Sequence, residues 1–152
     1  MDEYSIYWLE DAVADEFFYK GGLLYQFFKS SWLKDMDQDV QKQYAYITKK
    51  FVVEHLIAHV KSFRSNKQFV EIDGHMIQIK RKNQSITLEM YQNHLQFRCC
   101  TLKDAEELLF PILRSYHSSL FVAGINVHNY GWMTPRRSVE KYESRERLYF
   151  LL

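Results

Sequence analysis

Two histidines four residues apart, His55 and His59, come nearest in this chain to a catalytic motif. On a helix their rings would share one face, which is the spacing that zinc sites use. Zinc proteases of this type carry glutamate directly after the first histidine, where this chain has Leu56. A third ligand would have to come from elsewhere, so we expect two ordinary histidines and no metal site. A metal-dependent enzyme stays open as an alternative.

An acidic run at residues 35–39 imitates the start of a calcium-binding loop. Such loops need glycine at the sixth position and an acid at the twelfth, but Val40 and Tyr46 stand there. Acids at the positive end of a helix dipole explain the run equally well. The pair Gly21-Gly22 is not followed by the Lys-Ser/Thr of a phosphate loop. We therefore expect no cofactor and no enzymatic activity.

The composition is typical of a single domain, with an unusually large share of aromatic side chains. The chain has 152 residues, 47% of them hydrophobic and 16% aromatic, which is enough for a core of its own. Twenty Lys and Arg balance nineteen Asp and Glu, so the formal charge is +1. Proteins that grip a nucleic-acid backbone usually have clustered positive charge. Direct nucleic-acid binding is therefore not expected.

Cellular location follows from the thiols and from the first residues. Cys99 and Cys100 are neighbours, and on a strand they would point to opposite faces of the sheet. The chain starts without the basic and apolar segments of a signal peptide, and no window resembles a membrane span. We expect a cytoplasmic protein with free thiols and no membrane contact.

Hydrophobic periodicity predicts a strand and three helices in the first part of the chain. The strand covers residues 4–9, and a helix follows over about residues 12–30 with a break or a bend at Gly21-Gly22. Asp35, Asp37 and Asp39 open a second helix that runs through Ile47. Residues 52–63 form the third.

The second part reads as a four-stranded meander. Asp73-Gly74 joins strands at 69–72 and 76–79, and Gln92-Asn93 joins strands at 86–91 and 94–98. Thr101 caps a last helix that Pro111 kinks or delays, and a final strand covers 120–125. We expect an α+β fold over residues 1–152, a mostly antiparallel sheet with helices packed on it. The charged tail over about 137–152 is expected to be a loop or a short helix.

The first helix carries more apolar surface than one buried face needs. At about 100° per residue, Val13, Phe17 and Leu24 form one stripe, and a second stripe starts at Ala14 and Phe18 and includes Tyr25. Either the helix is covered on two sides, or one stripe packs inward and the other meets a partner.

These residues together resemble a known family, the sporulation inhibitors of replication called SirA. The resemblance is carried by Tyr7-x-Leu9, Ala14, Phe18, Phe28, Trp32, Gln43-x-x-Tyr46-Ile47-Thr48 and Tyr130-Gly131-Trp132-Met133-x-Pro135. It is clearest in the first 50 or so residues and in the Tyr-Gly-Trp segment. It implies a SirA-like domain spanning residues 1–152.

The resemblance implies a protein partner, the N-terminal domain of the replication initiator DnaA, and inhibition of chromosome replication during sporulation. It also implies that Val13 and Phe17, supported by Gln43, bind that partner. Val13 is smaller than the aromatic residue that the family pattern leads us to expect. Structural support is implied for Tyr130, Gly131, Trp132 and Pro135. We expect a monomer that forms a 1:1 complex.

A rival hypothesis uses the predicted sheet as a stacking platform for single-stranded nucleic acid. Phe69, Tyr91 and Phe97 would then face solvent on one side, with residues 80–82 guiding the phosphates. The near-neutral charge counts against this hypothesis, and the exposure of the rings would decide it.

Overall fold

The sheet is the framework on which every helix packs. A computed structural model describes residues 1–32, 37–63, 68–134 and 150–151. Within these ranges eight antiparallel strands form one sheet in the order β2-β3-β4-β5-β1-β6-β7-β8. The strands are β1 (Asp2–Trp8), β2 (Phe69–Asp73), β3 (Met76–Arg81), β4 (Gln84–Met90), β5 (Leu95–Cys99), β6 (Leu120–Gly124), β7 (Tyr130–Trp132) and β8 (Phe150–Leu151).

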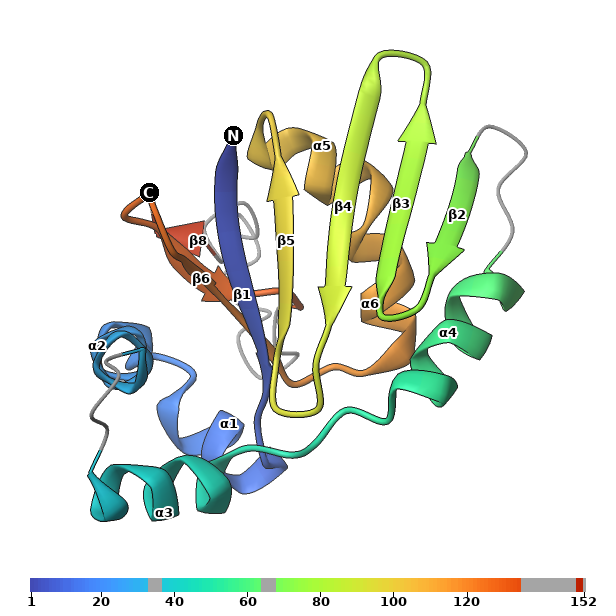
Figure 1. Cartoon of the computed structure of the whole chain (residues 1–152). Coiled ribbons are helices and arrows are strands. Elements are labelled where there is room, and N and C mark those ends of the chain that lie inside the picture. The colour runs from blue at the N-terminus through green and yellow to red at the C-terminus, as the bar shows by residue number, and fades with distance from the viewer. Residues whose placement is uncertain (33–36, 64–67, 135–149, 152) are drawn as a thin grey trace.

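Six helices in the described residues cover the sheet in two groups, one on each face (Figure 1). They are α1 (Asp11–Phe17), α2 (Gly21–Ser31), α3 (Gln38–Ile47), α4 (Val53–Ser62), α5 (Leu102–Leu108) and α6 (Phe110–Tyr116). This arrangement confirms the predicted α+β fold with an antiparallel sheet, its meander and its flanking N- and C-terminal strands.

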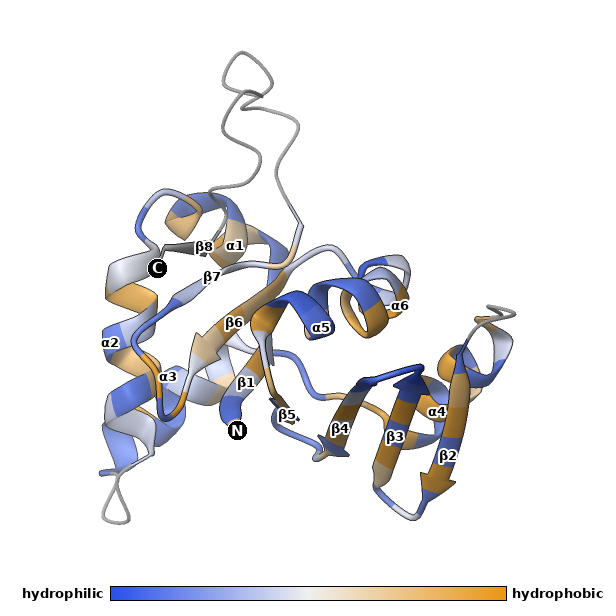
Figure 2. Cartoon of the chain, turned by 90° about the horizontal axis from the view of Figure 1, so that it is seen from above, coloured by the Kyte–Doolittle hydropathy of each residue, from blue (hydrophilic) through white to orange (hydrophobic). Residues whose placement is uncertain are grey.

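Each group of helices closes one hydrophobic cluster. The larger cluster lies between α4–α6 and the inward side chains of the meander, such as Ile79, Leu88 and Phe97. The smaller one lies between α1–α3 and the opposite face of β1, β6 and β7, where Tyr7 and Phe121 project. Figure 2, coloured by hydropathy, shows the two groups of helices standing apart. The strict alternation of buried and partly exposed residues along β4 and β5 explains why the meander was predictable.

The other face of the meander carries no helix among the residues that the structure describes. Figure 1 looks onto strands β2–β5 from this side, and α5 and α6 lie behind them. Its side chains are mostly polar, as expected where an antiparallel sheet meets water on one face. The helices α1–α3 therefore cover only the β1–β6–β7 part of this face.

Local differences from the predicted elements have simple causes. The break or bend expected at Gly21-Gly22 is a break, because α1 ends at Phe17 and α2 begins at Gly21. A Cβ on Gly21 would lie 3.1 Å from the ring of Tyr130, so glycine lets α2 approach β7. In the first hairpin Asp73 pairs with Met76, so the turn is Gly74-His75, with Gly74 at a φ of +61°.

The predictions for the last helix and for the C-terminal tail have different outcomes. Pro111 falls in the first turn of α6, and α5 ends just before it, as its missing N–H requires. The tail was expected to be a loop or a short helix. Its residues 150–151 instead form β8, which pairs with β7 at Tyr130 and Gly131, while residues 137–149 lie outside the described ranges. Cys99 is buried and Cys100 exposed, as the alternation predicted.

Candidate functional site

The first candidate residues, Val13 and Phe17, lie one turn apart on the short helix α1. Both are half-buried and pack against the smaller hydrophobic cluster with part of their side chains. The ammonium group of Lys20 lies 5.6 Å from the centre of the Phe17 ring. Each side chain therefore has one side on the core and one side available at the surface.

The two-stripe prediction for this region is wrong. Leu24 and Tyr25, assigned to different stripes, are both buried in α2, at 4% and 8% exposure. The stripes assumed one continuous helix, and the interruption after Phe17 resets the rotation of the side chains. Each of the two helices therefore has its own buried face and its own exposed face.

The third candidate, Gln43, lies on the outer face of α3 and is exposed. Tyr46, one turn further along, is 80% exposed. Tyr44 and Ile47 face inward on the same helix, and the hydroxyl of Tyr44 donates to the carbonyl oxygen of Asn93 at 2.8 Å. Burial raises the pKa of Tyr44, which keeps that phenol a donor. The inward side chains thus fix which face of α3 meets solvent.

Backbone hydrogen bonds join the start of α1 to the end of α3. The N–H of Glu10 donates to the carbonyl oxygen of Ile47 at 2.9 Å, and Leu9 and Thr48 form an isolated antiparallel bridge. The N–H of Lys49 donates to the carbonyl oxygen of Trp8 at 2.7 Å. These bonds make the two helices neighbours at one end, as Figure 1 shows.

We call Val13, Phe17, Gln43 and Tyr46 together the α1–α3 surface. Tyr46 was not assigned a role from the sequence, although it belongs to the Gln-x-x-Tyr pattern. Its signal is exposure: it is the most exposed large hydrophobic side chain in the described part of the chain. Periodicity cannot show this, because a tyrosine of an amphipathic helix fits either face.

The Tyr-Gly-Trp segment forms β7 and lies beneath the junction of α1 and α2. The indole N–H of Trp132 donates to the carbonyl oxygen of Phe18 at 2.9 Å, and the two rings stack at 5.6 Å. Tyr130 stacks on Tyr25 of α2 with ring centroids 4.8 Å apart. Gly131 is buried between them in the strand. Pro135 lies outside the described residues.

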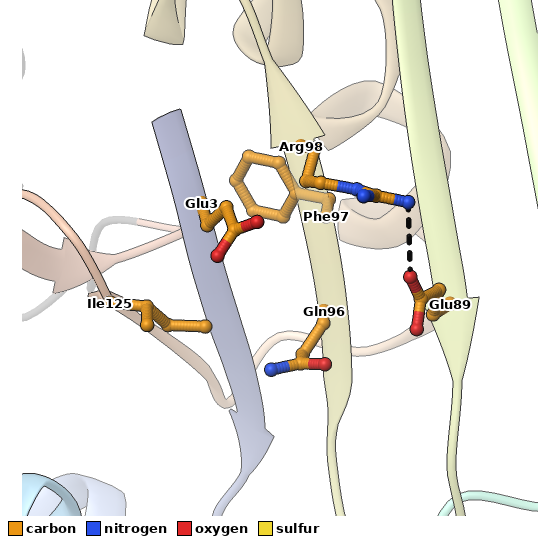
Figure 3. A pocket seen from close by; sticks show the side chains of 6 residues that line it. All are labelled: Glu3, Glu89, Gln96, Phe97, Arg98 and Ile125. Atoms are coloured by element: carbon orange, nitrogen blue, oxygen red, sulfur yellow. Dashed lines mark hydrogen bonds and ion pairs between the residues drawn. The ribbon is translucent and has the colours of Figure 1, made fainter. Parts of the chain in front are cut away.

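A shallow polar depression lies on the open face of the sheet (Figure 3). Its volume is about 60 Å³, and an ion pair between Arg98 and Glu89, with 3.3 Å between the charged atoms, runs along one side. Its lining is Glu3, Glu89, Gln96, Phe97, Arg98 and Ile125. It is too small to enclose a substrate, because ligand pockets are typically about 300–1,000 Å³.

The two histidines of the sequence motif both lie on α4, but their surroundings differ. His55 is exposed, whereas Nε2 of His59 lies 2.9 Å from the carbonyl oxygen of Ile112 and 2.8 Å from Oγ of Ser115. Across the described ranges, no three His, Cys, Asp or Glu side chains gather as metal ligands would. Among the helices of these ranges, none is long and apolar enough to span a membrane.

The condition set for a nucleic-acid platform is not met. Phe97 is 1% exposed and packs edge-on against Phe110 on the helix-covered face, whereas Phe69 is 58% exposed. Tyr91 is half-buried. The three rings therefore do not line one open face. Arg81, in the basic run beside them, is paired with Glu107 at 3.0 Å.

Comparison with known proteins identifies the family of this chain. The family model described as sporulation inhibitor of replication protein SirA matches residues 2–137. The chain belongs to the SirA family. The resemblance inferred from the sequence is thereby confirmed. A curated SirA relative, the sporulation inhibitor of replication protein SirA of Bacillus subtilis (strain 168), is 20% identical over 137 residues. That alignment covers 87% of this chain and 93% of the relative.

Membership has a direct consequence for the class of function. SirA proteins are described as sporulation inhibitors of replication, a regulatory family and not an enzyme family. A replication-related partner follows from that description. Because the matched range of 2–137 contains both α1 and α3, the α1–α3 surface belongs to the SirA-like part of the chain.

Proposed function

We propose that this protein inhibits the initiation of chromosome replication by binding the N-terminal domain of the initiator DnaA through the α1–α3 surface. It does so as a cytoplasmic monomer in a 1:1 complex, without cofactor, catalysis or direct contact with nucleic acid. The observation that carries the proposal is the exposure of Tyr46 on α3 together with the half-buried pair Val13 and Phe17 on α1, two helices that the bond between Glu10 and Ile47 joins. Membership of the SirA family supplies the process in which the surface acts.

The composition of the α1–α3 surface suits a protein interface. Interfaces draw most of their affinity from a few large side chains, and tyrosine is enriched among them. Phe17 and Tyr46 supply two aromatic anchors, Val13 adds a small apolar contact, and Gln43 adds an amide that both donates and accepts. Completing the burial of one such apolar side chain contributes up to about 1.5–3 kcal/mol.

The rigidity of the surface also favours binding. Its helices are joined to each other through Glu10 and Ile47 and are packed on the sheet through Tyr44. A surface held in this way loses little conformational freedom when a partner docks. We propose that Tyr130, Gly131, Trp132 and Pro135 support it from below. For Trp132 the support is the bond to the carbonyl oxygen of Phe18.

The proposed mechanism is steric. A folded domain seated on the α1–α3 surface covers the part of DnaA that it contacts, so that other partners are excluded from that part. The effect needs one inhibitor per initiator and depends only on affinity and concentration. Val13, smaller than the aromatic side chain expected at that position, favours a shallower pocket on the partner.

Calorimetry with the purified chain and the isolated DnaA domain tests the proposal. We expect a 1:1 complex, and we expect Phe17→Ala and Tyr46→Ala to weaken it at least about tenfold, as for interface anchors. Phe69→Ala is the matched control, since that ring is also exposed but lies on β2. The proposal fails if folded partners form no complex at about 50 µM, a concentration well above a micromolar Kd. It also fails if the control variant weakens binding as much as Phe17→Ala.

A further inference from the structure

Ser119, the residue before β6, connects three parts of the chain. Its N–H donates to Nδ1 of His117 at 3.1 Å, and its carbonyl oxygen accepts from the N–H of Leu9 at 3.0 Å. Its hydroxyl donates to Oδ1 of Asp11 at 2.9 Å. Ser119 is 5% exposed, and its bonds to His117 and Asp11 are partly buried, so water competes with them less than it would at an open surface.

The bond to Asp11 matters because α1 begins there. The N-cap residue Glu10 makes no capping bond with its side chain, so that the first turn lacks the usual local closure. Asp11 is bonded to Ser119, and the N–H of Glu10 is bonded to Ile47. The position of the first turn of α1 therefore depends on groups far away in the sequence.

His117 can make its bond to Ser119 in one protonation state only. A neutral imidazole has one nitrogen that accepts, and here the acceptor is Nδ1. An imidazolium carries a proton on both nitrogens, so Nδ1 can no longer accept from the N–H of Ser119. Protonation would set two donors against each other at 3.1 Å.

Each element around His117 contributes to its titration. From β1, the uncharged ring of Trp8 lies 4.5 Å from the imidazole ring, and Tyr116 of α6 contacts Trp8. The ammonium group of Lys49 lies 5.4 Å from the centre of the Trp8 ring, and α1 contributes Asp11. Burial lowers the pKa of His117, Lys49 lowers it further and Asp11 opposes both. The ring is therefore neutral at neutral pH.

We propose that His117 and Ser119 form a latch on α1 that holds its first turn while the His117 ring is neutral and releases it when the ring is protonated. The inference rests on the proposed function for the claim that α1 is a partner-binding element. The latch itself requires no partner. Because Val13 lies in this first part of α1, release would loosen one edge of the α1–α3 surface.

The direction of the pH effect follows from linkage. The pKa of His117 is lower in the folded protein than the ordinary value of 6.5. A released or unfolded state therefore binds protons more readily than the latched one. Its population relative to the latched state rises as pH falls below about 6.5. Above that pH the latch contributes fully.

Hydrogen exchange of the full chain, followed by NMR, tests the latch. The reporter is the amide of Ala14, which donates to the carbonyl oxygen of Glu10 at 2.9 Å and so closes the first turn. Between about pH 7.5 and about pH 5.5, values on either side of a histidine pKa, we expect its protection factor to fall about three- to tenfold. The amide of Leu88 in the meander should change much less.

His117→Asn is the matched control. An asparagine side chain accepts from the N–H two residues further on, and it does not titrate in this range. Protection of Ala14 should then be independent of pH, although His94, another half-buried histidine whose pKa burial lowers, is retained. Ser119→Ala, which removes only the bond to Asp11, should lower the protection at both pH values. A pH response of His117→Asn equal to that of the parent chain would overturn the latch.

Affinity for the DnaA domain, measured for the same three proteins, separates the latch from the proposed function. If the latch acts on binding, the parent chain loses affinity below about pH 6.5 and His117→Asn loses less. A latch seen by exchange in a chain that never binds DnaA refutes the proposed function alone. Binding without any pH response of Ala14 refutes the latch alone.

Discussion

Trp132 donates its indole N–H to the carbonyl oxygen of Phe18 at 2.9 Å, at the point where α1 ends and the chain turns into α2. The two rings also stack at 5.6 Å. Strand β7 is thus hydrogen-bonded to the junction that follows the first helix. This contact explains how β7 can affect the α1–α3 surface without belonging to it.

Trp132→Phe should reduce both stability and partner affinity, because it keeps a ring and removes the bond to Phe18. Trp8→Phe removes the same atoms, but the indole N–H of Trp8 is buried and has no hydrogen-bond partner within the described ranges. We therefore expect Trp132→Phe to lose about 1 kcal/mol more in free energy of unfolding than Trp8→Phe. Urea denaturation measures both variants, and equal losses would show that the Trp132 bond contributes nothing.

Phe17→Ala should destabilise the fold moderately, and not leave it unchanged as a fully exposed anchor would. Full burial makes such a substitution cost about 3–5 kcal/mol, and Phe17 is half-buried, so we expect about 1–2 kcal/mol. Phe28→Ala, at a site with 0% exposure, should reach the upper range. Thermal unfolding followed by circular dichroism compares them. A loss as large as that of Phe28→Ala would place Phe17 in the core and remove it from the binding surface.

Gly124→Ala should be more damaging than the substitution of Gly21, Gly22 or Gly74. The added Cβ would lie 2.3 Å from the carbonyl oxygen of Val127, which is backbone and cannot turn aside. We expect a loss of about 3 kcal/mol from the forced shift. Gly22→Ala meets only the hydroxyl of Tyr130 at 3.3 Å and should stay within about 0.5 kcal/mol of the parent chain. Chemical denaturation of the two variants would contradict this if their order were reversed.

Only one of the two neighbouring thiols should react in the native protein. Cys100 is exposed, whereas burial raises the pKa of Cys99 to about 12, so that almost none of its reactive thiolate exists near neutral pH. A thiol reagent such as Ellman's should label one group rapidly and the second only after unfolding. Cys100→Ser should abolish the rapid phase. Rapid labelling that survives in Cys100→Ser would show that Cys99 is accessible.

Most secondary structure of this chain could be predicted because its signals are local. The meander alternates buried and polar residues strictly, and Asp37 caps α3 by accepting from the N–H of Val40 at 2.8 Å. For residues 12–30 the sequence predicted a break or a bend at Gly21-Gly22 and could not decide between them, because the apolar pattern continues through the gap between α1 and α2. The junction between α1 and α2 contacts β7, where Trp132 donates to Phe18 and Tyr130 lies against Gly21, and periodicity cannot contain contacts with a strand so far away in the sequence.

For the candidate binding residues, too, some properties followed from the sequence and others only from the tertiary structure. By itself, the sequence determined the fold class, the resemblance to SirA and the presence of Val13, Phe17 and Gln43 on helices, because residue types and spacing suffice for these. Only the tertiary structure decided that Val13 and Phe17 are half-buried and that Tyr46 is exposed. It also decided that Ser119 bonds to Asp11. Exposure and long-range bonds depend on which elements pack together, and that is set by the free energy of the whole fold.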